Sequence, residues 1–428
     1  MKICVFGLWH LGSVTAACLA GAGFDTVGLD DDAAVIENLA CGRPPLFEPG
    51  LSELICSGLE SGHLAFTTDR SVVRGADVVW VTFDTPVDGD DRADVPYVLD
   101  KICDIFPFLR DNAIVLVSSQ LPVGSIARIE KMFEVLANGR HVSFVCSPEN
   151  LRLGKAINVF RNPGRVIVGS RNEAVRSVIS RLFAPFSDNI IWVGTEAAEM
   201  TKHAINAFLA TCVVFANEIA SVSEKVGADA REVEIAMRSE PRIGENAYIR
   251  PGGAFAGGTL ARDVTFLSEL AIQYRLPLYM IGNILTSNTA HGDWPLRRLE
   301  DLFGALLRRK IAILGLSYKP GTDALRRSLS VALIRKLCVA GASVSAFDPA
   351  VRSLPDAPTG FHLAGSCKEA LDGAEAAIVM TEWPDFRDLS AADFVEWMAS
   401  PNVLDQNRFL SHLAADPRIR YDSIGRTT

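Results

Sequence analysis

The sequence predicts an α/β protein in which two doubly wound α/β domains flank a helical domain. Short apolar strands alternate with helical patterns at both ends of the chain, starting at residues 2–7 and again at 310–316. Between these regions, from Thr195 to about Val226, the pattern changes to one long helix. We therefore expect domain boundaries that give residues 1–195, 196–296 and 305–428.

Composition indicates a folded protein that does not bind nucleic acid. The 428 residues are 49% hydrophobic and 22% charged, enough to bury a large core. The net charge of −9 argues against a nucleic-acid-binding protein, which needs a basic patch. No run of about 18 uncharged apolar residues occurs, so we expect no membrane span. The nine cysteines have no CxxC pair or metal-ligand spacing, so we expect no metal site and a reducing, cytoplasmic location.

The first segment predicts a Rossmann domain that binds NAD. A strand at residues 2–7 leads into a glycine turn, a small-residue helix, and a second strand that ends in Asp30. In this pattern a pyrophosphate lies on the helix N-terminus, and the acid accepts hydrogen bonds from the adenosine ribose. Gly7, Leu11 and Gly12 belong to the turn, and Asp30 favours NAD over the 2′-phosphorylated cofactor.

The turn departs from the pattern at Trp9, which stands where the second glycine belongs. That glycine normally lets the backbone approach the pyrophosphate, so a Rossmann-like unit that binds nothing is the alternative. Asp30 and the further buried strands favour NAD; these strands are residues 78–82, 113–118, 142–146, 165–169 and 190–194. Ligands bind beyond the carboxyl ends of such strands, where Thr85 and the segments 119–124 and 147–149 follow.

Two charged segments follow in the middle of the chain. Lys202 and Asn206 are four residues apart on the long helix and therefore share one face. The lysine is either a snorkelling end-of-helix residue or a site group with a lowered pKa. Farther on, residues 242–263 contain four closely spaced glycines among arginines, which predicts an irregular loop that holds an anionic ligand rather than a simple surface turn.

The last domain repeats the α/β pattern without obvious sequence repetition of the first. Its strands are expected at 310–316, 343–349, 376–381 and 402–405, with helices near 328–340 and 391–398. Gly315, Lys319, Asp323 and Arg326 lie in its first strand-to-helix turn. The two α/β domains would therefore provide two nucleotide-sized sites.

Along nearly its whole length the chain resembles the UDP-glucose/GDP-mannose dehydrogenase family. EPGLSELI at 48–55 resembles the family's YEPGL segment, LPVGS at 121–125 its TVPVGT, and SPENLRLG at 147–154 its NPEFLREG. RIG and PGGAFAGGTLARDV, within 242–264, resemble RIG and PGxGFGGSCxPKDV. GLSYKPGTDALRRS at 315–328 resembles GLAFKPNTDDIRES, and TEWPDF at 381–386 resembles TEWxEF.

The resemblance implies a homodimer with an N-terminal NAD domain, a central dimerisation domain and a C-terminal nucleotide-sugar domain. It implies oxidation of a sugar alcohol to a carboxylate by two NAD molecules, through a cysteine thiohemiacetal and thioester. Its catalytic positions fall on Glu149, Lys202, Asn206, Thr259 and Asp263. Cofactor contacts fall on Gly7, Leu11, Gly12, Asp30, Thr85 and Arg326, and substrate contacts on Leu151, Arg242, Tyr248, Phe255, Gly257 and Lys319.

The departures from the family motifs concern the covalent half of this chemistry. Thr259 stands at the position of the nucleophilic cysteine, and Gly258 replaces the serine before it. Leu153 replaces the second glutamate of NPEFLRE, and Gln120 the threonine of TVPVG. A threonine hydroxyl without a dedicated base is a poor nucleophile. Cys146 and Cys212 could in principle substitute, but both are expected to be core residues.

Three hypotheses remain. The first is an NAD-dependent enzyme limited to one alcohol-to-carbonyl oxidation, or to a redox-neutral variant, on a nucleotide sugar. The second is full oxidation to the uronic acid by a non-cysteine route, such as an aldehyde hydrate. The third is a protein that binds nucleotide sugar or NAD without turnover. Retention of Lys202, Asn206 and Asp263 together favours an enzyme.

Overall fold

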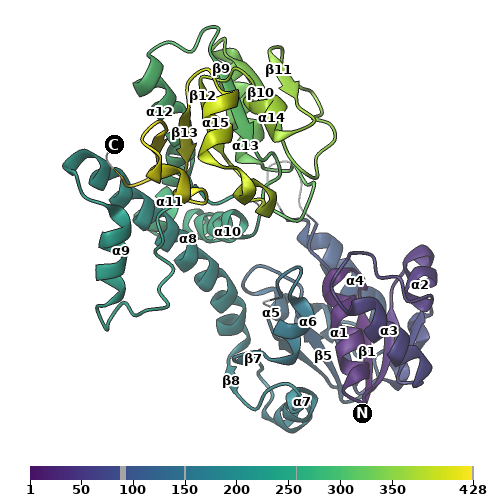
Figure 1. The fold of residues 1–428 in the computed structure, drawn as a ribbon. Coiled ribbons are helices and arrows are strands. Elements are labelled where there is room, and N and C mark those ends of the chain that lie inside the picture. The colour runs from purple at the N-terminus through teal and green to yellow at the C-terminus, as the bar shows by residue number, and fades with distance from the viewer. Residues whose placement is uncertain (87–92, 149–150, 257, 427–428) are drawn as a thin grey trace. The chain divides into compact units, whose positions relative to one another are not determined.

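The computed structural model describes residues 1–428 except 87–92, 149–150, 257 and 427–428 (Figure 1). The chain divides into two compact units, Met1–Ala204 and Ile205–Thr428. We call them unit 1 and unit 2.

Among the described residues, unit 1 is built on an eight-stranded sheet with the order β3-β2-β1-β4-β5-β6-β7-β8. The strands are β1 (Lys2–Phe6), β2 (Asp25–Leu29), β3 (Leu64–Thr67), β4 (Val78–Val81), β5 (Ala113–Val117), β6 (Val142–Cys146), β7 (Val166–Gly169) and β8 (Ile190–Val193). Strands β1 to β6 are parallel, and β7 joins β6 in the antiparallel sense. The prediction that 190–194 is a buried strand was wrong in one respect, because β8 is an edge strand and Ile191 is 42% exposed.

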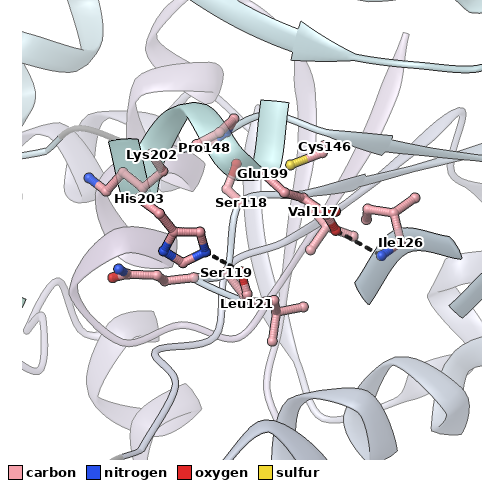
Figure 2. A pocket seen from close by; sticks show the side chains of 11 residues that line it. Val117, Ser118, Ser119, Leu121, Ile126, Cys146, Pro148, Glu199, Lys202 and His203 are labelled. Carbon is pink, nitrogen blue, oxygen red and sulfur yellow. Dashed lines mark hydrogen bonds between the residues drawn. The ribbon is translucent and has the colours of Figure 1, made fainter. Parts of the chain in front are cut away.

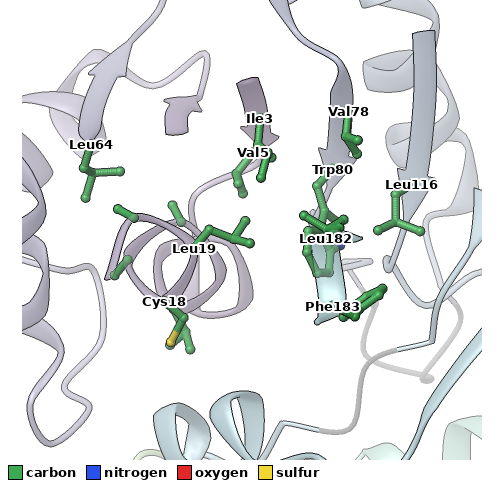
Figure 3. Packing of buried hydrophobic residues seen from close by; sticks show 14 of the residues in the cluster. Ile3, Val5, Cys18, Leu19, Leu64, Val78, Trp80, Leu116, Leu182 and Phe183 are labelled. Atoms are coloured by element: carbon green, nitrogen blue, oxygen red, sulfur yellow. The ribbon is translucent and has the colours of Figure 1, made fainter. Parts of the chain in front are cut away.

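Helices cover both faces of this sheet because alternate residues of β1 point to opposite sides. Ile3 and Val5 pack with α1 (His10–Gly21), α3 (Leu51–Glu60), α6 (Ala156–Arg161) and α7 (Arg176–Phe183). Cys4 and Phe6 pack with α4 (Val95–Ile105) and α5 (Ser125–Glu134). Figure 3 shows the first cluster, with Leu19 of α1 below β1 and Phe183 of α7 near Trp80. Burial of each large apolar side chain stabilises the fold by about 1.5–3 kcal/mol.

Unit 2 contains, in its described part, a six-stranded parallel sheet with the order β11-β10-β9-β12-β13-β14. Its strands are β9 (Lys310–Leu314), β10 (Ser343–Phe347), β11 (Phe361–Leu363), β12 (Ala376–Val379), β13 (Asn402–Asp405) and β14 (Arg420–Asp422). The helices α12 (Trp294–Phe303) and α13 (Leu329–Val339) pack on one face, and α14 (Cys367–Leu371) and α15 (Ala391–Trp397) on the other. Its first five strands therefore follow the same order as β3-β2-β1-β4-β5 of unit 1.

The helices before this sheet differ from the expectation in two places. They are α8 (Thr195–Val226), α9 (Ala230–Arg238), α10 (Thr259–Tyr274) and α11 (Tyr279–Gly292). The predicted irregular loop 242–263 ends early, because α10 already begins at Thr259. The helical stretch expected from Leu276 to Phe303 is two helices, α11 and α12, separated at Asp293. Unit 1 also contains α2 (Ala33–Ala40).

Within the described chain, only α8 has the length and apolar composition of a membrane-spanning helix. Its most apolar window has a mean hydropathy of 1.6 and is 33% buried. The prediction of no membrane span rested on uncharged runs, and α8 meets the looser criterion that tolerates two charged residues. A core helix of a water-soluble protein meets the same criterion.

Candidate active site

The turn between β1 and α1 has the geometry of a dinucleotide-binding loop. Gly7 has a φ of +96°, which disfavours any side chain, and a Cβ there would lie 2.8 Å from the ring of Phe83. A Cβ on Gly12 would overlap the carbonyl oxygen of Gly7, so only glycine lets α1 pack this closely on the turn. Trp9 has a φ of −69°, which any residue adopts, and its side chain is 45% exposed. The turn therefore forms without a glycine at position 9.

This turn leaves groups free that fit a pyrophosphate and a ribose. No side chain caps the N-terminus of α1, so the N–H groups of its first turn, including those of Leu11 and Gly12, are available to an anion. The carboxylate of Asp30 accepts hydrogen bonds from the N–H groups of Leu8 at 2.7 Å and Asp32 at 3.0 Å. Asp30 remains partly exposed, so it can also accept from ribose hydroxyls.

Unit 2 has a similar turn after β9, but the aspartate of that turn is buried and hydrogen-bonded within the unit. Gly315 has a φ of +95°, and Asp348 follows β10 as Asp30 follows β2. Asp348 is only 1% exposed and accepts from the N–H groups of Leu316 and Ser317, at 2.7 and 2.9 Å, and from the Trp383 indole at 3.0 Å. Burial acts to raise the pKa of Asp348, but these hydrogen bonds prevail and hold the pKa below its usual value. The acid of unit 2 is thus a structural group, whereas Asp30 of unit 1 stays accessible to a ligand.

Hydrogen bonds join the carboxyl ends of the next strands of unit 1. The Trp80 indole donates to the Ser118 hydroxyl at 2.9 Å, and Ser118 donates to the Ser147 carbonyl at 2.6 Å. The Thr85 hydroxyl donates to the Gln120 carbonyl at 2.6 Å. Thr85 therefore holds two strand ends together, and its lone pairs remain able to accept.

A small cavity lies beside these strand ends (Figure 2). Its volume is about 20 Å³, which is room for about one water molecule. Lys202 and His203 of α8 line it together with Ser119 and Cys146. The His203 ring lies 3.2 Å from the Leu121 carbonyl, which only accepts, so Nε2 carries the proton. Lys202 thus borders a mostly apolar recess and is half-buried.

Two buried carboxylates hold the loops of unit 1 by binding helix N-termini. Glu48 is 3% exposed and accepts from the N–H groups of Gly154 and Ala156, at 2.7 and 2.8 Å. Glu199 is 5% exposed and accepts from those of Gly124 and Ile126, at 2.7 and 2.9 Å. Burial raises the pKa of Glu199, and these bonds oppose the rise. The carboxylates therefore fix the two segments that follow β5 and β6.

In unit 2, the structure brings three of the predicted catalytic positions together. Asn206 of α8 and Asp263 of α10 are 6% and 0% exposed, and the Asn206 amide donates to the Asp263 carboxylate. Thr259 is one helical turn before Asp263 on α10, and it is exposed. Lys202 is one turn before Asn206 on α8. A buried carboxylate and amide are thus fixed beside one another on facing helices.

The glycine-rich segment before α10 is held by side chains, several of which the sequence did not indicate. The side-chain oxygen Oδ1 of Asn217 accepts a hydrogen bond from the Gly252 N–H at 3.0 Å. Oδ1 of Asn407 accepts one from the Gly253 N–H at 2.8 Å. The Asn288 amide both accepts from and donates to the backbone of Phe255, at 2.9 and 3.0 Å. Asn288 lies on α11 and Asn407 after β13, so distant parts of unit 2 converge on this segment.

His291 completes this set. It is 7% exposed, and its Nε2 lies 2.9 Å from the Gly252 carbonyl, so Nε2 must carry the proton. Burial lowers the pKa of His291, although its bond to Gly252 opposes the shift. We refer to Asn217, Asn288, His291 and Asn407 as the loop clamp. Asn288 and His291 share one face of α11, a spacing of buried polar residues that could have been noticed in the sequence.

The other predicted site residues occupy the following positions, and two of them fall outside the described residues. Arg242 is exposed and pairs with Glu240 at 2.8 Å, and Tyr248 is 58% exposed. Lys319 and Arg326 lie in the loop between β9 and α13 of unit 2. Leu151 packs against the core of unit 1. Glu149 and Gly257 fall outside the residues that the structure describes.

The cysteines offer no ready substitute for the nucleophile. Burial raises the pKa of the Cys146 thiol and that of the Cys212 thiol, which disfavours the reactive thiolate. Cys212 also packs with Ala216 and Ile249. No cluster of metal-ligating side chains occurs in the part of the chain that the structure describes.

Substitution of Asp30 by asparagine should weaken NAD binding by roughly 10-fold, because the ribose loses a charged acceptor. Isothermal titration calorimetry with NAD measures this. Asp25→Asn, at the exposed start of β2, is the matched control and should leave the affinity unchanged. Equal affinities for the Asp30 and Asp25 variants would contradict a ribose contact at Asp30.

Comparison with known proteins gives one consistent result. Residues 1–187 match the NAD-binding domain of the UDP-glucose/GDP-mannose dehydrogenase family, 196–290 its central domain and 312–412 its UDP-binding domain. The chain is 33% identical to the UDP-glucose 6-dehydrogenase of Rhizobium meliloti over 100% of both chains, and 33% identical to that of Pseudomonas aeruginosa over 100% of this chain and 98% of the other. A solved UDP-glucose dehydrogenase from Pyrobaculum islandicum has a TM-score of 0.87 at 28% identity, covering 100% of this chain and 98% of that one. The chain therefore belongs to the UDP-glucose/GDP-mannose dehydrogenase family and is an NAD-dependent nucleotide-sugar dehydrogenase.

Proposed function

We propose that this dehydrogenase carries out a single two-electron oxidation of a hydroxyl group on its nucleotide sugar. The observation that carries the proposal is the buried Asn206–Asp263 pair, one helical turn from Lys202 and next to a threonine at the position of the family's cysteine. The pair and the lysine are suited to proton transfer. Thr259 is not suited to form a thioester.

In the proposed reaction the C–H and O–H bonds of the alcohol break and a carbonyl forms. NAD, when bound, accepts the hydride from carbon. Lys202 takes the hydroxyl proton, directly or through a water molecule, and its positive charge then stabilises nearby negative charge on oxygen. Asn206 holds the Asp263 carboxylate in a fixed position on the facing helix α10.

The chain lacks the residues that the family's covalent route needs for a second oxidation. A thioester needs a thiolate, and the residue at that position is Thr259. Leu153, in place of a glutamate, is 46% exposed and carries no group that could activate water. Full oxidation through an aldehyde hydrate is the alternative, and the product analysis below distinguishes the two.

The product ratio tests the proposal directly. Incubation of the protein with NAD and each member of a panel of nucleotide sugars, including UDP-glucose, should yield one NADH per sugar consumed. Mass spectrometry should find a product two hydrogens lighter than the substrate. Two NADH per sugar with a carboxylate product would establish the hydrate route. Binding without NADH formation would establish a non-catalytic protein.

Lys202→Ala should reduce the rate of NADH formation by at least about 100-fold, because general-base catalysis typically contributes this much. Lys225→Ala, near the end of the same helix, is the matched control and should retain full activity. Initial rates at saturating NAD measure both variants. Activity in Lys202→Ala comparable to that of the control would exclude Lys202 as the base.

Asn288→Ala should lower kcat more than it raises KM, because loss of both hydrogen bonds to Phe255 loosens the segment that leads into Thr259 and Asp263. We expect a fall in kcat of roughly 10-fold. Asn283→Ala is the control, since Asn283 is on the same helix but exposed and bonds only within it. A change in thermal stability with unchanged kcat would show that Asn288 is purely structural.

We also propose that residues 196–296 form a dimerisation domain. Phe208, Phe215 and Val222 recur every seven residues on α8 and are 67%, 44% and 59% exposed. Such a stripe is costly in water and typical of helices that pack against a partner. It offers an explanation for the apolar character of α8 without a membrane. The nine cysteines are all free, which agrees with a cytoplasmic location.

Phe215→Glu should convert the dimer to a monomer, because a charge in an apolar interface is poorly solvated. Light scattering coupled to size-exclusion chromatography measures the mass. Phe47→Glu, at an 84% exposed position of unit 1, should remain dimeric. A monomeric unsubstituted protein, or a dimeric Phe215→Glu, would contradict this interface.

A further inference from the structure

Arg327 is held in an uncommon backbone conformation within unit 2. It lies in the loop between β9 and α13, directly before Ser328, whose hydroxyl caps α13. Its φ is +58°, in the left-handed region that residues other than glycine, asparagine and aspartate rarely adopt. Such a conformation costs about 1 kcal/mol or more and persists only where the surroundings fix it. The fold therefore fixes the direction in which this side chain leaves the backbone.

The guanidinium of Arg327 reaches Gly258. A Cβ built on Gly258 would overlap the Nη1 atom of Arg327, so the arginine occupies the space that a side chain at 258 would need. Both positions depart from the family motifs quoted above, where 258 is a serine and 327 a glutamate. The two substituted positions, 258 and 327, are thus in contact. At position 327 the substitution replaces a negative charge with a positive one.

This point lies at the start of α10. Gly258 is the N-cap residue of that helix, no side chain caps it, and Thr259 is the first helical residue. Burial lowers the pKa of Arg327, yet a guanidinium stays protonated at neutral pH. A partly desolvated cation attracts an anion more strongly than one in water. The positive end of the α10 dipole acts in the same direction.

We propose that Arg327 is a specificity-determining residue that binds a carboxylate carried by the sugar of the nucleotide-sugar ligand, and that Gly258 is required to admit its guanidinium. The inference rests on the proposed function, in which position 259 lies at the reacting end of the sugar. An uncharged hydroxymethyl group would gain little from this cation. A carboxylate accepts two parallel hydrogen bonds from a guanidinium, which fixes its orientation.

The test compares two ligands that differ only in this group: UDP-glucose and its C6 carboxylate, UDP-glucuronate. Calorimetric titrations are run on the full-length protein without NAD, so turnover plays no part. Arg327→Asn should weaken binding of the carboxylate by roughly 10-fold or more and change that of UDP-glucose less than about 2-fold. Asparagine tolerates the left-handed backbone, so the fold is retained.

Arg308→Asn is the matched control. Arg308 is also an arginine with a left-handed φ, +62°, in unit 2, but it is exposed before β9. Its substitution should leave both affinities unchanged. A second arm uses Gly258→Ala, which should displace the guanidinium and weaken carboxylate binding as Arg327→Asn does. In the double variant the two effects should not add, because each removes the same contact.

The possible results distinguish failure of the proposed role of Arg327 from failure of the proposed function. If the unsubstituted protein binds both ligands but Arg327→Asn weakens both equally, or neither, the role of Arg327 is overturned while the proposed function stands. Additive effects in the double variant would likewise overturn the link between Gly258 and Arg327. If the unsubstituted protein binds neither ligand, the proposed function is contradicted and the inference falls with it.

Discussion

The backbone of the segment 252–255 belongs to no helix or strand, so its N–H and C=O groups depend on side chains for hydrogen bonds. The loop clamp meets this need with groups from α8, α11 and the residues after β13. Each buried amide or imidazole left without its partner would cost about 1–3 kcal/mol. The start of α10 carries Thr259 and leads to Asp263. Its position therefore depends on hydrogen bonds from distant parts of unit 2. Glu48 and Glu199 serve the same purpose for the loops of unit 1.

The two α/β sheets show how one turn can be open or closed to a ligand. Gly7 and Gly315 share nearly the same φ, and an aspartate follows the neighbouring strand in each unit. The difference is the number of donors around that aspartate. Asp348 is saturated by its own unit, including the Trp383 indole, whereas Asp30 is partly exposed. The hydrogen bonding of one carboxylate thus distinguishes a turn that is accessible to a ligand from one that is closed.

Local patterns predicted the strands and the NAD turn, since alternation of apolar residues and the glycine spacing are local properties. They misplaced the start of α10, because a dense run of glycines hides the helix that begins at Thr259. The loop clamp escaped notice because Asn288, His291 and Asn407 gain their role only through long-range contacts. The contact of Arg327 with Gly258 was equally invisible, since the two residues are 69 positions apart in the sequence. At Trp9 the backbone has a φ that does not require glycine, so the turn forms although the motif departs there.

The central claim is that oxidation stops at a free carbonyl and never passes through an acyl ester on the protein. Turnover in the presence of hydroxylamine tests it, because hydroxylamine converts an aldehyde or a ketone to an oxime and a thioester or ester to a hydroxamate. Mass spectrometry of the small-molecule products distinguishes the two by mass. We predict the oxime of the nucleotide-sugar carbonyl product, with one NADH formed for each. A hydroxamate, formed with two NADH per sugar, would show that the protein makes an acyl intermediate and would contradict the account.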